Sequence, residues 1–132
     1  MSLWKPICRV DEIPALGARR VSRDHGLEVA LFRNDHDEVF ALLDRCPHKG
    51  GPLSQGIVLG RSVACPLHNW TIVLADGQAQ APDVGCAPRF AVLVQDGVVH
   101  LDAEELLHHA TELQRPLAGP ACRQPLDGGP KR

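Results

Sequence analysis

The sequence lacks features that several whole classes of protein require. No apolar run approaches the roughly 18 residues of a membrane-spanning helix. The N-terminal stretch MSLWKPICRV has neither the apolar core nor the cleavage site of a secretion signal. Positive charge is not in excess, because the formal net charge is −2, so nothing favours a nucleic-acid partner. We therefore expect a cytoplasmic protein with neither a membrane nor a nucleic acid as its partner.

Cysteines are few and unevenly spaced. The 5 cysteines form an odd, scattered set, which is a poor basis for disulfides in a chain whose thiols are expected to stay reduced. Cys8, Cys86 and Cys122 have no nearby histidine, and we interpret them as small apolar residues or idle thiols. Cys46 and Cys65 differ, because a histidine follows each of them within three residues.

The remaining pattern predicts one β-rich domain. The length of 132 residues and the hydrophobic fraction of 44% suit a single globular domain. Short β-branched and apolar runs alternate with turn residues and no helix intervenes, which predicts an all-β antiparallel sandwich or barrel. Asp96-Gly97 and Asp76-Gly77 are typical hairpin turns, and 34–38 is a looser one. The expected strands are 5–10, 19–21, 27–33, 39–44, 62–64, 71–74, 90–95 and 98–101.

After these strands the periodicity changes to that of a helix. Asp102 is a candidate N-cap for a C-terminal helix over 103–114, and Glu105 would complete a capping box. Apolar residues at helical spacing would pack one face of this helix on the β-domain. The segment 115–132 is rich in proline and glycine, which predicts a disordered tail.

Two short clusters carry candidate metal ligands. Cys46-Pro-His48 and Cys65-Pro-Leu-His68 each supply one thiol and one imidazole, a ligand set that suits zinc or an iron–sulfur centre. Zinc sites of this composition usually take two cysteines from one turn and two histidines from another. Here each pair contains one cysteine and one histidine. Only one residue separates Cys46 from His48, so binding a single ion through both side chains would strain the loop. Two irons relieve that strain when both cysteines bind one iron and both histidines the other, as in a Rieske [2Fe–2S] centre. A zinc-stabilised interaction module is the alternative of another class.

The order of these ligands, CPH followed sixteen residues later by CPLH, resembles the motif of the Rieske iron–sulfur family. The resemblance implies stacked antiparallel sheets over 4–102, with the cluster at the tip of a small cluster-binding subdomain over about 44–86. It also implies a third, proline-containing loop that covers the cluster, and VGCAPRF is similar to that loop. Leu53, Trp70 and Pro88 would then shield the cluster from water.

Residues absent from the ligand loops narrow the family further. Respiratory Rieske proteins carry an additional cysteine in each ligand loop, and the two cysteines form a disulfide. This chain has neither cysteine: Lys49, Gly50 and Gly51 follow its first histidine, and Leu67 precedes its second. Those proteins also place a hydroxyl residue shortly after the second histidine, where it donates a hydrogen bond to a cluster sulfide. This chain has Asn69 and Trp70 there, and Thr71 is the candidate donor. Fewer donors to sulfur predict a low reduction potential for this family, about −150 to 0 mV.

The sequence around the ligands is similar to the small subunit of NAD(P)H-dependent assimilatory nitrite reductase. The similarity rests on WKPICRVDEIPALGARRV, LEVALFRNDHDEVFALLDRCPH, KGGPLSQGIVLG, CPLHNW and GCAPRF, and it spans residues 4–101. In that family a large subunit with siroheme, FAD and a [4Fe–4S] cluster reduces nitrite to ammonia, and the small subunit supplies the Rieske domain. Some members have lost the cluster ligands, and this chain keeps all four.

The resemblance therefore implies a redox subunit of an oxidoreductase in nitrate assimilation. Such a subunit transfers electrons and is not catalytic alone. Within the same family, the alternative is the Rieske ferredoxin component of an aromatic-ring dioxygenase system, which has the same cluster and a different partner.

Overall fold

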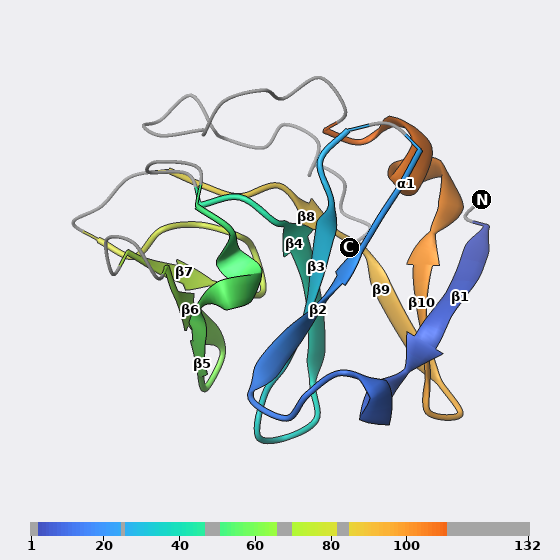
Figure 1. Cartoon of the computed structure of the whole chain (residues 1–132), viewed down its shortest axis with the longest axis horizontal. Helices are drawn as coiled ribbons and strands as arrows, with labels where there is room; N and C mark the ends of the chain where they lie inside the picture. Colours follow the sequence, from blue (N-terminus) through green and yellow to red (C-terminus); the bar gives the residue numbers. More distant parts are fainter. Residues whose placement is uncertain (1–2, 25, 47–50, 66–69, 82–84, 111–132) are drawn as a thin grey trace.

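The computed structural model describes residues 3–24, 26–46, 51–65, 70–81 and 85–110. Its strands form three antiparallel sheets, so the predicted all-β antiparallel fold is confirmed (Figure 1). None of the helices in these residues is long and apolar enough to span a membrane. The strands are β1 (Trp4–Arg9), β2 (Gly17–Val21), β3 (Val29–Arg33), β4 (Val39–Leu43), β5 (Ile57–Leu59), β6 (Ser62–Ala64), β7 (Thr71–Val73), β8 (Arg89–Phe90), β9 (Val92–Gln95) and β10 (Val98–Asp102). The helices are the short 3-10 turns η1 (Val10–Glu12) and η2 (Leu53–Gln55) and the α-helix α1 (Ala103–His108).

The three sheets lie side by side, with the largest in the middle. The central sheet has the strand order β2-β3-β4-β8. Figure 1 shows the outer sheet, β1-β10-β9, on one side of it and the small sheet, β5-β6-β7, on the other. In sequence, β5 and β6 lie between the two segments that carry the predicted ligands, and β7 follows the second segment.

Strand β3 shows why the central sheet takes the middle position. Val29, Ala30, Leu31 and Phe32 follow one another and are all 0% exposed. Side chains alternate between the two faces of a strand. Ala30 and Phe32 accordingly join the core with the small sheet, and Val29 and Leu31 join the core with the outer sheet. A continuous apolar run is thus what a strand covered on both faces requires.

The predicted turns are confirmed. Asp96 and Gly97 both have positive φ, 54° and 76°, and they join β9 to β10 as a two-residue hairpin in which Gln95 pairs with Val98. The loop 34–38 joins β3 to β4. Its Asn34 is 1% exposed, and the Asn34 side-chain oxygen accepts the backbone N–H of Glu38 at 2.9 Å.

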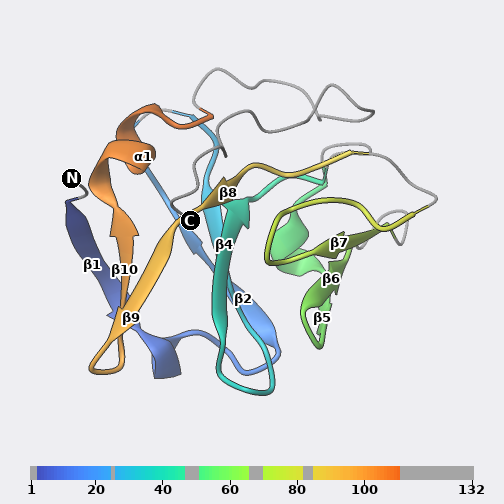
Figure 2. The same ribbon diagram turned by 180° about the vertical axis from the view of Figure 1, so that it is seen from behind.

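Two strand predictions need correction. The predicted strand 90–95 is divided, because β8 pairs with β4 in the central sheet and β9 pairs with β10 in the outer sheet. Figure 2 shows the chain leaving the end of β8 toward β9. Strand β5 was not predicted, because Val58 is its one buried residue and its two outward side chains are exposed.

The predicted helix begins where expected and ends early. Asp102 caps it, since its side chain accepts the backbone N–H of Glu104 at 2.9 Å. The predicted capping box is wrong, because the Glu105 carboxylate accepts the N–H of Ala91 instead, at 2.8 Å. Helix α1 ends at His108, and Ala110 has a positive φ of 57°. Residues 109 and 110, which were expected to be helical, therefore lie outside the helix. Residues 111–114 and the predicted tail 115–132 lie outside the described residues.

Candidate metal centre

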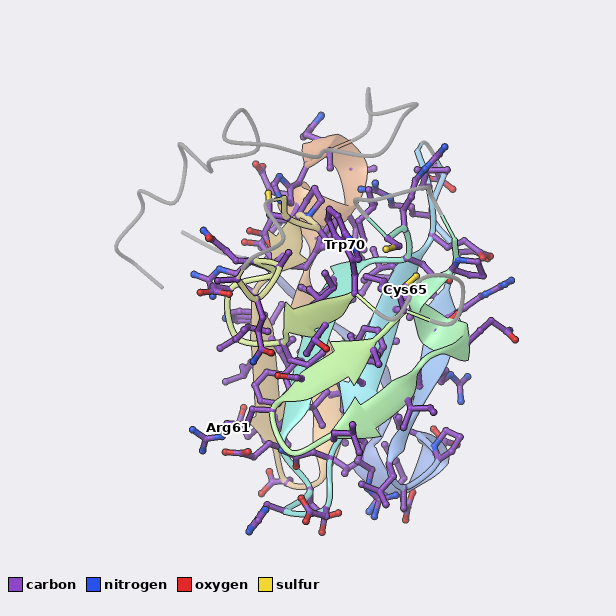
Figure 3. The ribbon with its side chains drawn as sticks, turned by 90° about the vertical axis from the view of Figure 1, so that its left-hand side faces the viewer. Arg61, Cys65 and Trp70 are labelled. Atoms are coloured by element: carbon purple, nitrogen blue, oxygen red, sulfur yellow. The ribbon has the colours of Figure 1, made fainter. Side chains whose placement is uncertain are left out.

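The two predicted cysteine ligands lie in one core. Cys46 follows the end of β4 and is 0% exposed, and Cys65 follows β6 directly and is 1% exposed. Both belong to the core between the central and small sheets. Figure 3 shows Cys65 and Trp70 at one end of the small sheet and Arg61 at the other. The fold therefore brings together two thiols that are distant in the sequence.

Each cysteine begins a loop that is closed in the same way. The backbone N–H of Cys46 donates to the carbonyl of Gly51 at 2.7 Å, and the N–H of Cys65 donates to the carbonyl of Trp70 at 2.7 Å. In sequence, His48 and His68 fall between these paired residues, and both lie outside the described residues. Their assignment as ligands stays a prediction.

The three residues predicted to shield the centre are buried to different degrees. Leu53 is 0% exposed and belongs to the same core as the two cysteines. Trp70 is half-buried and packs against that core. Pro88 is buried, and its carbonyl accepts the N–H of Leu43 at 2.8 Å, which fixes the residues before β8 on the central sheet. Such buried side chains can exclude water from a neighbouring metal centre. That they shield the cluster stays a prediction.

A glycine holds the Pro88 segment close to the turn that follows β7. Gly77 has a φ of +76°, and a Cβ at this position would lie 2.0 Å from the carbonyl oxygen of Ala87. The N–H of Ala87 donates to the carbonyl of Gly77 at 2.7 Å. The predicted Asp76-Gly77 turn is therefore confirmed, and only glycine combines this conformation with so close an approach.

Sequence reasoning missed a buried carboxylate beside the first ligand loop. The side chain of Asp44 is 4% exposed, and its Oδ2 lies 3.1 Å from Nε of Arg20. Nothing local in the sequence identifies this pair, since Arg20 comes from β2 and Asp44 follows β4. An aspartate two residues before a ligand cysteine was the available signal, and it is weak because aspartate is common in turns.

The chemistry of the described donors fits an iron–sulfur centre. Cys46 and Cys65 present two soft sulfur ligands in an apolar core, where a thiolate is stable chiefly as a metal ligand. Arg45, one residue before Cys46, has a buried Nε with no hydrogen-bond partner. Among the described residues no group of three or more possible metal ligands occurs, and both predicted histidines fall outside that set.

The other cysteines match the interpretation as packing residues. Cys8 is 8% exposed and Cys86 is 0% exposed. Burial raises the pKa of the Cys8 thiol, which keeps it protonated and unreactive. Cys122 lies outside the described residues.

The far end of the small sheet carries a different polar group. Arg61 donates to Glu38 from Nε at 3.0 Å and from Nη2 at 2.6 Å, and this pairing lowers the pKa of Glu38. An open depression of about 380 Å³ is lined by Asn34, His36, Glu38, Gly60 and Arg61. Figure 3 shows Arg61 at the end of the small sheet away from Cys65, so this depression is separate from the predicted metal centre.

Comparisons with known proteins identify the family. The Rieske [2Fe-2S] domain matches residues 3–93. The 3-phenylpropionate/cinnamic acid dioxygenase ferredoxin subunit of Photorhabdus laumondii is 35% identical over 101 residues, which cover 75% of this chain and 93% of that protein. The NADH nitrite reductase small subunit of Escherichia coli is 34% identical over 108 residues, which cover 76% and 98%.

A solved structure agrees with these sequence relatives. The ferredoxin of Sphingomonas yanoikuyae B1 superposes with a TM-score of 0.66 at 26% identity, over 77% of this chain and 98% of the ferredoxin. Nitrite reductase small subunits and dioxygenase ferredoxins are thus similar to this chain to nearly the same degree. The chain belongs to the family of Rieske [2Fe–2S] domains, electron-transfer proteins whose cofactor is a Rieske-type [2Fe–2S] cluster.

Proposed function

We propose that this protein is an electron-transfer subunit that binds its cluster through Cys46, His48, Cys65 and His68. The observation that carries the proposal is the position of the two cysteines, which are 0% and 1% exposed in the same core. Each begins a loop closed by a 2.7 Å backbone hydrogen bond, and each loop contains one of the two histidines in its sequence.

A Rieske cluster, when bound, exchanges one electron at a time with a partner. The chain's own contribution is to hold it. Cys46 and Cys65 would supply the thiolates for the inner iron, and His48 and His68 would each bind the outer iron through one ring nitrogen. The second ring nitrogen of each histidine could hold a proton, which couples electron uptake to pH.

The ligand assignment can be tested with matched cysteine variants. Cys65→Ser should abolish the visible and EPR spectra of a Rieske centre, whereas Cys8→Ser should keep them, because Cys8 is also buried but lies in the other core. His68→Ala should also abolish the spectrum while far-UV circular dichroism still reports the β-fold. An intact Rieske spectrum in Cys65→Ser would overturn the assignment.

We further propose that the partner is a large subunit with siroheme, FAD and a [4Fe–4S] cluster that reduces nitrite to ammonia with electrons from NAD(P)H. Support comes from the similarity to the Escherichia coli small subunit over 98% of its length. It also comes from the ligand loops, which lack the additional cysteines of respiratory Rieske proteins. The proposed location is the cytoplasm, where NAD(P)H and reduced thiols are available.

A dioxygenase system is the second candidate, because the Photorhabdus laumondii ferredoxin subunit is 35% identical over 93% of its length. The two partners can be compared directly with the same cluster-loaded protein. Co-purification with the siroheme subunit and restoration of NAD(P)H-dependent nitrite reduction would support the first candidate. Stimulation of a ring-hydroxylating oxygenase, without any effect on nitrite reduction, would reject the first and support the second.

A further inference from the structure

Asp44 connects two parts of the chain that flank the first ligand loop. Its Oδ1 accepts the backbone N–H of Ser54 at 2.7 Å, and its Oδ2 accepts the Ser54 hydroxyl at 2.8 Å. Arg20 Nε lies 3.1 Å from the same Oδ2, and the Asp44 side chain is 4% exposed. The carboxylate is therefore buried and bonded through both of its oxygens, with a positive charge beside it.

These bonds lie directly outside the bond that closes the loop. Asp44 precedes Cys46 by two residues, and Ser54 follows Gly51 by three. Since Cys46 donates its N–H to the carbonyl of Gly51, two successive connections tie the base of the loop. Asp44 is itself fixed beside the central sheet, because its N–H donates at 2.9 Å to the carbonyl of Glu28, the residue before β3. Asp44 thus connects the base of the first loop to the central sheet.

The second ligand loop is built differently. Its ends are joined by the backbone bond from Cys65 to Trp70. Within the described part of the chain, no carboxylate connects the residues on either side of that loop. Among the described residues, the first loop is thus tied at its base by a side chain as well as by the backbone.

A tie that served only stability would not need a charged group. Burying a carboxylate costs free energy, and the arginine beside Asp44 is a weak compensation because its side chain is 47% exposed. Hydrogen bonds in the layer behind metal ligands, by contrast, commonly fix the ligands and tune the metal. We propose that Asp44 is a positioning residue of the metal centre, which holds the first loop so that Cys46 and His48 reach the cluster together. This inference rests on the proposed function.

The test compares full-length proteins purified without oxygen: wild type, Asp44→Ala, Asp44→Asn, Ser54→Ala and Glu38→Gln. Glu38→Gln is the matched control, because Glu38 is also a carboxylate bonded to an arginine, Arg61, at the end of the small sheet away from Cys65. Iron and acid-labile sulfide, the rate of cluster loss to a chelator, the EPR line shape after reduction and the thermal midpoint of the cluster-free protein are measured for each.

We expect Asp44→Ala to lose its cluster about 10- to 100-fold faster than wild type and to show a changed EPR line shape. Ser54→Ala should show a smaller change in the same direction. Asp44→Asn should be intermediate, because its amide oxygen can still accept the N–H of Ser54. Glu38→Gln should keep the wild-type rate and line shape even where its thermal midpoint falls.

Two outcomes would overturn the inference, and they are distinguishable. If the Asp44 and Ser54 variants match Glu38→Gln in cluster loss and line shape, Asp44 has a structural role only. Should Asp44→Ala not fold, Ser54→Ala decides the question, since it keeps the backbone bond. If the wild type itself takes up no iron and sulfide, the proposed function fails, and the positioning role fails with it.

Discussion

Arg23 gives the sharpest prediction about stability. Its guanidinium binds the carbonyls where α1 ends, with Nη1 at 2.6 Å from the carbonyl oxygen of His109 and Nη2 at 3.3 Å from that of Ala110. Nε donates to the carbonyl of Leu27 at 2.7 Å, and the guanidinium carbon lies 5.1 Å from the centre of the Phe90 ring. One side chain therefore joins the loop before β3, the end of α1 and strand β8 of the central sheet.

The magnitude follows from the two short hydrogen bonds. A hydrogen bond to a charged donor contributes about 1.5 to 3 kcal/mol, so Arg23→Met should lower the free energy of unfolding by about 3 to 4 kcal/mol. Burial lowers the pKa of Arg23, because desolvation disfavours the charged form, and this cost keeps the expected loss at the lower end of the sum. At about 4 °C per kcal/mol, the thermal midpoint should fall by roughly 12 to 16 °C. Arg23→Lys keeps the charge without the planar fork, and should recover only part of the loss.

Thermal and urea unfolding of the cluster-free protein, followed by far-UV circular dichroism, would measure these changes. Arg61→Met is the matched control, because Arg61 also makes two short hydrogen bonds but its side chain is 69% exposed, so solvent screens the pair. We expect Arg61→Met to have a much smaller effect than Arg23→Met. Equal shifts for the two variants would show that the Arg23 hydrogen bonds contribute no more to stability than the exposed pair of Arg61.

Three further predictions concern single residues. Hydrogen bonds from Arg61 lower the pKa of Glu38, so the stabilisation from this group is present above its unfolded pKa of about 4.3 and is lost as the pH falls through the lower folded pKa. Thermal midpoints of wild type and Glu38→Gln should therefore differ at neutral pH and converge in strong acid, and a constant difference would contradict this. Leu53→Ala removes a fully buried side chain and should cost about 2 to 5 kcal/mol in urea unfolding, and a neutral result would show that Leu53 is not a core residue. Gly77→Ala places a Cβ 2.0 Å from a carbonyl oxygen, whereas Gly60, also at positive φ, has open space, so Gly77→Ala should destabilise far more than Gly60→Ala in the same assay.

Local patterns allowed much of the fold to be predicted. The Asp96-Gly97 turn depends on two neighbouring residues with positive φ, and the apolar run of β3 reflects burial on both faces. The cysteines of the candidate site could be identified for a similar reason, because each occurs within a short motif.

Features that depend on distant parts of the chain could not be predicted. Strand β5 has one buried residue, Val58, and forms because β6 lies beside it. Glu105 leaves the expected capping box because Ala91, between β8 and β9, presents an N–H to it. The bonds of Asp44 and Arg23 join segments that only the folded structure brings together. No periodicity or spacing in the sequence reports such contacts.

Metal analysis of the anaerobically purified protein shows whether Cys46, His48, Cys65 and His68 hold a [2Fe–2S] cluster. We expect two irons and two acid-labile sulfides per chain, with a Rieske EPR signal after reduction. One zinc per chain and no sulfide would contradict this expectation, and would favour the zinc-stabilised interaction module instead.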